Sequence, residues 1–162
     1  PTPTRLAMVE TLAIASGSRG MAGGQALDMA AIGRTLDLLE LEDLHIHKTG
    51  ALLRASVKLG WLAAHPDPTQ VQALEHYAKA LGLAYQIRDD ILDVEGDSTL
   101  LGKTQGKDQQ QNKPTYPALL GLSEAKQKAA ELHQTALAAL QAWDERADPL
   151  RVLAAQLALR IS

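Results

Sequence analysis

The sequence predicts an all-α protein, and three observations support this fold class. Ala and Leu dominate the composition, β-branched residues are sparse, and Phe is absent. Aromatic residues make up only 3% of the chain, which favours helices over a sheet. Apolar residues also recur with helical spacing over several long segments. At 162 residues the chain has the size of one domain, and we expect residues 1–162 to form a single α-helical domain fragment.

Residues 4–16 predict the first helix, with Thr4 as a possible cap. Its buried face is expected to comprise Leu6, Val9, Leu12 and Ala13. The sequence opens at Pro1 without an initiator Met and enters this helical pattern at once. We therefore expect the chain to be a fragment of a longer protein.

The next segment, residues 17–28, is rich in glycine and reads GSRGMAGGQALD. Such a density of glycine either breaks a helix or lets it pack closely on a neighbour. We reject a phosphate-binding P-loop, because no strand precedes the segment and no GKS or GKT motif ends it. Asp28 is interpreted most simply as a helix cap. Residues 30–39 are weakly patterned and predict a loop with a helical turn.

A second helix is predicted over residues 41–64, and apolar side chains surround its axis almost completely. Lys48, Thr49 and Gly50 interrupt this apolar run. Lys48 either extends its ammonium to the surface or faces the same cavity as the aspartates of the next helix. His45 and His47 are two residues apart and lie on different faces, so packing or surface roles are favoured over a metal pair.

The third predicted helix starts with Asp67 as N-cap and Pro68 at the first helical position. It runs to about Glu95 and ends at Gly96, a length of roughly 40 Å at 1.5 Å per residue. Most of its circumference is apolar and is expected to be buried.

The far end of this helix carries an acidic stripe within the sequence AYQIRDDILDVEGD. At about 100° per residue, one side of the helix gathers Gln86, Asp89, Asp90, Asp93 and Asp97. Like charges four residues apart cost roughly 0.2–0.5 kcal/mol per pair, so the stripe needs a cation. A cluster of hard oxygen ligands points to Mg²⁺, which is typically held by one or two carboxylates together with substrate phosphates. The alternative is a solvated acidic face.

Residues 96–117 predict a polar loop that contains Lys103, Lys107 and Lys113. Lysines directly beyond three aspartates suggest a site that holds a polyanion and a divalent cation together, although solubilising surface charge is the alternative. Residues 115–121 predict a short helix. Residues 123–147 predict a long helix starting at Ser123, and residues 148–162 a last one.

Composition excludes several functional classes. The formal net charge of −3 gives no electrostatic case for nucleic acid binding. Cysteine is absent, so disulfides and thiolate metal sites are impossible. No apolar run approaches the roughly 18–20 residues that span a bilayer, and we expect a cytoplasmic protein without a stable membrane anchor.

Several motifs, taken in order, resemble the trans-isoprenyl diphosphate synthases, and the resemblance is closest to the bacterial farnesyl and geranyl diphosphate synthases. The motifs are GGQALD (23–28), HKTGALLRASVKLG (47–60), LGLAYQIRDDILDVEGD (81–97), LGKTQGKD (101–108), NKPTYP (112–117) and ALLGLSEAK (118–126). The resemblance covers essentially the whole chain. It implies the C-terminal part of an isoprenoid-synthase-type helical bundle.

The resemblance also implies a reaction: magnesium-dependent condensation of isopentenyl diphosphate with an allylic diphosphate to give geranyl or farnesyl diphosphate. By analogy, Mg²⁺ would be held by Asp89, Asp90, Asp93 and Asp108. The diphosphate would contact Lys48, Lys103 and Lys113. Lys48, Thr49 and Gln86 would act at the reacting centre, where oxygen dipoles stabilise a carbocation. Gln25 and Asp28 would line the same cavity.

The chain departs from the family pattern in one respect. The family's first aspartate-rich motif, and the basic residues that bind isopentenyl diphosphate, are absent from residues 1–83. The resemblance therefore implies that the N-terminal half of the same enzyme is missing and that the fragment alone is inactive. Family members are usually homodimers, so a homodimer is expected. The alternative is a non-catalytic helical partner subunit of a heteromeric prenyl synthase.

Overall fold

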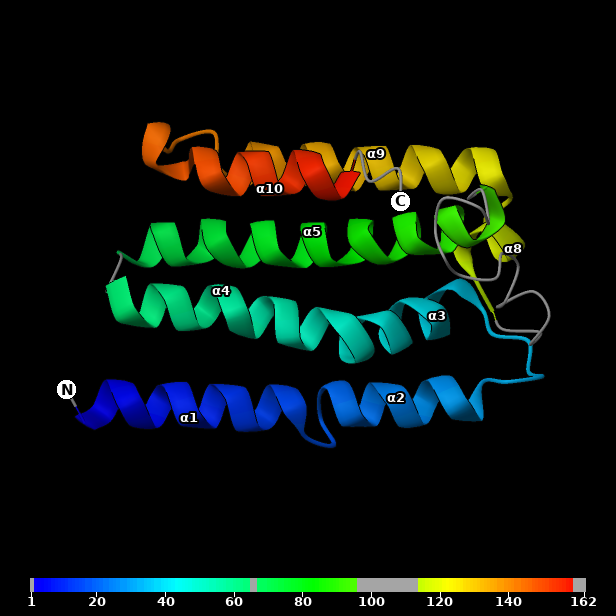
Figure 1. Cartoon of the computed structure of the whole chain (residues 1–162), viewed down its shortest axis with the longest axis horizontal. Coiled ribbons are helices and arrows are strands. Elements are labelled where there is room, and N and C mark those ends of the chain that lie inside the picture. The colour runs from blue at the N-terminus through cyan, green and yellow to red at the C-terminus, as the bar shows by residue number, and fades with distance from the viewer. Residues whose placement is uncertain (1, 65–66, 96–113, 159–162) are drawn as a thin grey trace.

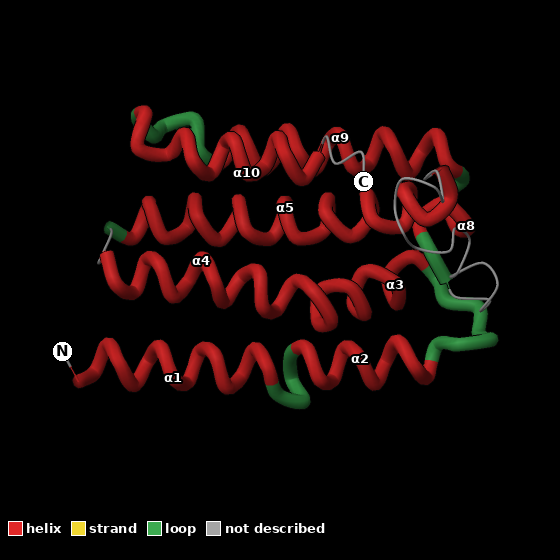
Figure 2. Tube along the Cα trace, viewed as in Figure 1, coloured by secondary structure: helices red, strands yellow, loops and turns green. Residues whose placement is uncertain are grey.

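The computed structural model describes residues 2–64, 67–95 and 114–158, which contain helices and connecting turns only. The prediction of an all-α protein is confirmed (Figure 2). In chain order the helices are α1 (Thr2–Ser16), α2 (Met21–Ala30), α3 (Leu38–His45), the π-helix η1 (Ile46–Gly50), α4 (Ala51–Ala64), α5 (Pro68–Glu95), α8 (Tyr116–Leu120), α9 (Leu122–Ala139), the 3-10 helix η2 (Glu145–Ala147) and α10 (Asp148–Ala158).

The helices lie side by side along the long axis of the molecule (Figure 1). The segments α1 and α2 follow one another in the outermost layer and pack on α4 and η1. The continuous run α3–η1–α4 packs on α5, and α5 packs on α9 and α10. The C-terminal end of α5 therefore meets α3 and α8 at one end of the bundle.

The helix α5 contributes to both large apolar clusters of the described chain. One cluster joins α5 to α9 and α10 through Leu74, Tyr77, Ala80, Leu81, Ala136, Leu140 and Ala154. The other joins the C-terminal part of α5 to α3, α8 and α9 through Leu41, Ile87, Ile91, Tyr116 and Ala125. Fully burying a Leu or Ile side chain stabilises the fold by about 1.5–3 kcal/mol, so these clusters hold the acidic end of α5 in place.

Two helix starts follow from side-chain caps. The predicted start of α5 is confirmed. Asp67 Oδ1 accepts a hydrogen bond of 2.9 Å from the backbone N–H of Gln70, and Pro68 is the first helical residue. Hydrogen bonds from Thr69 and Gln70 lower the pKa of Asp67. The predicted loop over 30–39 is wrong at its end: α3 already begins at Leu38, because Asp37 and Glu40 form a capping box.

The predicted long helix over 123–147 is wrong at both ends. The helix α9 begins at Leu122 with Gly121 rather than Ser123 at its boundary, and it ends at Ala139. Beyond this end, the guanidinium of Arg151 in α10 donates to the carbonyl oxygens of Leu140 and Trp143, each at 2.7 Å. These bonds satisfy carbonyl groups that a longer helix would have paired internally.

The predicted buried face of α1 is wrong for the described chain. The side chains of Leu6 and Val9 are 68% and 66% exposed, and Leu12 is 49% exposed. Only Ala15 of this helix is buried. Among the described elements α1 packs mainly on α4 and, less, on α2, and its outer apolar face is left uncovered. Among the described helices, none combines the length and the apolar character needed to cross a bilayer.

The glycine-rich segment both ends α1 and allows a close approach. The chain turns between Ser16 and Met21, and Gly24 of α2 then packs directly on the backbone of η1. A Cβ placed on Gly24 would overlap the backbone N and Cα of Lys48. Because the obstacle is backbone rather than a flexible side chain, only glycine fits between these two helices.

We predict that Gly24→Ala destabilises the protein by about 1–3 kcal/mol, since overpacking a filled contact forces the two helices apart. The measurement is the free energy of unfolding in urea. Gly60→Ala in α4 is the matched control, because a Cβ there meets nothing within 4 Å. Its expected effect is neutral or stabilising by up to about 1 kcal/mol. Equal destabilisation by the two variants would contradict the close contact.

A second prediction concerns Tyr77, whose hydroxyl donates a hydrogen bond of 2.7 Å to the carbonyl oxygen of Leu150 and so ties α5 to α10. Burial raises the pKa of Tyr77 from 10.0 to about 12. Between these pH values the unfolded chain releases the phenolic proton and the folded chain keeps it, so stability falls as pH rises. We expect Tyr77→Phe to cost about 1 kcal/mol at pH 7 and to flatten this alkaline decline in urea unfolding curves. An unchanged pH dependence would argue against this assignment.

Candidate functional site

The π-helical turn η1 presents two of the predicted catalytic side chains, Lys48 and Thr49. It lies inside a continuous helical run formed by α3, η1 and α4, which confirms a helix over the predicted range 41–64. A π-turn makes i→i+5 hydrogen bonds and widens the helix locally, and such turns are frequent at functional sites. The turn coincides with the lysine, threonine and glycine that interrupt the apolar pattern.

Two glycines bring η1 close to its neighbouring helices. On α2, Gly24 contacts the backbone of Lys48, and Asp28 lies one turn further along the same face. On α5, a Cβ placed on Gly82 would lie 3.6 Å from Gly50 Cα, and Gln86 lies one turn further along that face. Each glycine therefore places a polar side chain of its own helix against η1.

Lys48 is paired with Asp28, with 3.0 Å between Nζ and Oδ2. The two side chains are 31% and 23% exposed, so the pair is reached by solvent. The interpretation of Asp28 as a helix cap is wrong, because Asp28 lies inside α2 and its carboxylate pairs with η1. Its predicted place beside the substrate cavity stays a prediction. Gln25, also on α2, is exposed, and its role stays a prediction.

A chain of hydrogen bonds leads from η1 into the acidic stripe. The Thr49 hydroxyl donates to Gln86 Oε1 at 3.0 Å, and Gln86 Nε2 donates to Asp90 Oδ1 at 3.3 Å. The other oxygen of Asp90 accepts a 3.0 Å bond from the backbone N–H of Tyr116, at the start of α8. Gln86 and Asp90 are buried, whereas Thr49 is half-buried.

The other two aspartates of the stripe lie differently. Asp89 is exposed and Asp93 is half-buried, and the two carboxylates are one helical turn apart. The described residues include no group of three or more His, Asp or Glu side chains arranged to hold a metal ion. A hard cation that keeps several waters and binds substrate phosphates needs only one or two carboxylates, and this pair fits that requirement.

Several predicted site residues lie outside the described residues. These are the stripe residue Asp97, the predicted metal ligand Asp108, and the lysines Lys103, Lys107 and Lys113.

The two histidines beside η1 differ in their surroundings. His45 is 6% exposed, and its ring stacks on Tyr116 with 5.7 Å between centroids. His47 is half-buried, and its Nδ1 lies 2.8 Å from the carbonyl oxygen of Asp43. Burial, together with the negative charges of Glu42 and Asp90, raises the pKa of Tyr116 above its ordinary value. The sequence pattern did not predict that His45 or Tyr116 contacts the acidic stripe. The structure shows these contacts, because Asp90 of the stripe is buried against both residues.

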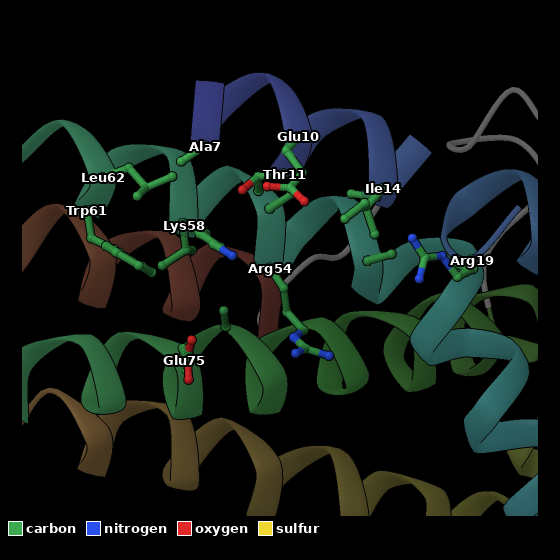
Figure 3. A pocket seen from close by; sticks show the side chains of 15 residues that line it. Ala7, Glu10, Thr11, Ile14, Arg19, Arg54, Lys58, Trp61, Leu62 and Glu75 are labelled. Carbon is green, nitrogen blue, oxygen red and sulfur yellow. The ribbon is translucent and has the colours of Figure 1, made fainter. Parts of the chain in front are cut away.

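A hollow of about 530 Å³ lies between α1, α4 and α5 (Figure 3). Side chains from α1 such as Glu10 and Ile14 line one side, and Arg54 and Lys58 of α4 line another. Glu75 of α5 contributes a second carboxylate. This hollow is bounded on its outer side by the layer whose apolar face is uncovered.

The sequence and fold match one family of proteins. A family model described as polyprenyl synthetase matches residues 4–148. The farnesyl diphosphate synthase of Escherichia coli is 54% identical over 129 residues, which are 79% of this chain and 43% of that protein. The chain therefore spans about half the length of the curated relatives it matches.

Solved structures agree with this assignment. An FPP/GFPP synthase from Zymomonas mobilis is 36% identical, with a TM-score of 0.84 over 97% of this chain and 52% of that chain. A geranyltransferase from Helicobacter pylori, complexed with magnesium and isoprenyl diphosphate, is 32% identical, with a TM-score of 0.81 over 97% of this chain and 52% of that chain. With the family model covering most of its length, this all-α chain belongs to the polyprenyl synthetase family.

Proposed function

We propose that this chain is the C-terminal part of a magnesium-dependent prenyltransferase, which condenses isopentenyl diphosphate with an allylic diphosphate to give geranyl or farnesyl diphosphate. The observation that carries the proposal is the convergence of three helices on one site. Lys48 of η1 pairs with Asp28 of α2, and Thr49 of η1 donates to Gln86 of α5, which in turn donates to Asp90 in the acidic stripe. The names of the relatives supply the substrate class.

The carboxylates of Asp89 and Asp93 are the proposed magnesium ligands, because they are accessible and one turn apart. Bound Mg²⁺ would supply Lewis acidity that stabilises the departing pyrophosphate. Lys48 would bind the diphosphate as a cation, which requires it to exchange its partly exposed partner Asp28 for phosphate oxygens. Because solvent reaches this pair and screens its attraction, the exchange costs less than it would for a buried pair.

The oxygens of Thr49 and Gln86 are proposed to stabilise positive charge on the allylic carbon. Their mutual hydrogen bond of 3.0 Å and the contact of Gln86 with Asp90 hold both side chains before substrate binds. Dipoles fixed in advance stabilise a developing charge without having to reorient during the reaction.

The chain is also proposed to work together with further polypeptide. The apolar face of α1, formed by Leu6, Val9 and Leu12, is open to solvent and offers a surface for helix packing. The relatives are about twice as long as the matched region, and their additional length supports a missing N-terminal half. We also propose that the complete protein forms a homodimer and is located in the cytoplasm.

The metal assignment is tested by titrating Mg²⁺ into the chain in the presence of inorganic pyrophosphate, with calorimetry as the measurement. Asp89→Asn should weaken magnesium binding by about 100-fold or more, because losing a direct ligand should cost at least as much as the roughly 10–100-fold that losing a supporting partner costs. Glu145→Gln in η2 is the control, since it removes an exposed carboxylate beyond the end of α9 that lies away from α8. Absence of binding by the unchanged chain, or equal weakening by the two variants, would contradict the assignment.

The second test concerns turnover. With dimethylallyl and isopentenyl diphosphates, the 162-residue chain alone should release pyrophosphate at a negligible rate, because the family's first aspartate-rich motif is absent from residues 1–83. Robust release by the chain alone would refute the claim that half of the site is missing. Release that depends on a different catalytic subunit would favour the alternative of a non-catalytic helical partner.

A further inference from the structure

Asp90 is held by three separate elements of the fold. Its side chain is almost fully buried, with the residue 4% exposed. One oxygen accepts a hydrogen bond from Gln86 on α5, and the other accepts the backbone N–H of Tyr116 on α8. The imidazole of His45 on α3 approaches that second oxygen, with 3.7 Å between Nε2 and Oδ2. A buried carboxylate requires such partners, and here they come from segments up to 45 residues away in sequence.

The surroundings of His45 favour its contact with the Asp90 carboxylate. Its ring lies nearly parallel to that of Tyr116, with an angle of 18° between the planes. Both ring nitrogens are buried, and neither forms a hydrogen bond within the described part of the chain. The carboxylate of Asp90 is the acidic group paired with this imidazole. His45 therefore closes the side of Asp90 that Gln86 and Tyr116 leave uncovered.

Asp89 differs from its neighbour in direction. Successive helical residues point about 100° apart, so two adjacent aspartates cannot face the same space. Asp89 is exposed, whereas Asp90 points into the contact between α5, α3 and α8. The acidic stripe is thus divided between an outward carboxylate and an inward one.

We propose that Asp90 is an internal tether rather than a magnesium ligand, and that His45 is the positioning residue that keeps its carboxylate against α8. The tether joins the end of α5 to the start of α8, and through Gln86 it joins both to Thr49 of η1. Its consequence for catalysis rests on the proposed function, because the tether would fix the direction of Asp89 toward the metal.

The tether is tested by measuring hydrogen exchange of the Tyr116 amide by NMR in the complete chain. Asp90→Asn should raise the exchange rate of this amide by about tenfold or more, because its charged acceptor is lost. Asp89→Asn is the matched control, with the same chemistry one residue away, and should leave the rate unchanged.

The positioning role of His45 is tested with two substitutions. His45→Phe keeps a flat ring against Tyr116 but removes both nitrogens, and it should raise exchange of the Tyr116 amide. His45→Gln places an amide nitrogen near the position of Nε2 and should restore slow exchange. Full protection in His45→Phe would mean that the ring acts by packing alone, and it would overturn the positioning role.

Magnesium titration with inorganic pyrophosphate separates the two aspartates. Asp90→Asn should lose about tenfold in magnesium affinity, the lower end of the cost of losing a supporting residue, while Asp89→Asn loses about 100-fold or more. Equal losses of magnesium affinity in the two variants would overturn the tether proposal, whatever the exchange rate of the Tyr116 amide. An unchanged exchange rate of this amide in Asp90→Asn would overturn it as well. If the unchanged chain binds no magnesium, the proposed function fails, but the exchange measurements still decide whether Asp90 is a tether.

Discussion

The close contact of η1 with both α2 and α5 is the constraint on which the site depends. A Cβ at position 24 would overlap the backbone of η1, so glycine is required there, whereas a Cβ at position 82 would make ordinary van der Waals contact with Gly50, 3.6 Å from its Cα. With the backbones close together, Lys48 reaches Asp28 and Thr49 reaches Gln86, each at 3.0 Å. The same contact that packs the helices therefore assembles the polar groups of the site.

The acidic end of α5 combines two kinds of carboxylate. The inward one, Asp90, is satisfied by hydrogen bonds from Gln86 and the Tyr116 amide, so its burial does not leave an uncompensated charge. The outward one, Asp89, is accessible to solvent and to ligands. A stripe that looks unfavourable on an isolated helix is eased in the folded chain, because one of its carboxylates turns inward and accepts hydrogen bonds from two other groups.

Stability is distributed unevenly across the layers. The helix α5 lies between the two apolar clusters, which hold the acidic end of the site on a rigid element. The outer layer formed by α1 and α2 buries little, since Leu6 and Val9 remain largely exposed. Lys48 and Gln86 therefore lie on the better-supported part of the described structure, whereas α1 is held by fewer buried contacts.

Features that depend on local chemistry could be predicted from the residues alone. Helical spacing predicted the all-α class, and the pair Asp67 and Pro68 predicted the start of α5, because caps act within one turn. The acidic stripe was likewise visible from spacing alone. The packing of helices was needed to reveal the pairing of Asp28 with Lys48, the end of α9 beneath Arg151, and the burial of Asp90 against Tyr116. These features join residues 11–26 positions apart, and their partners are chosen by the packing of whole helices rather than by neighbouring residues.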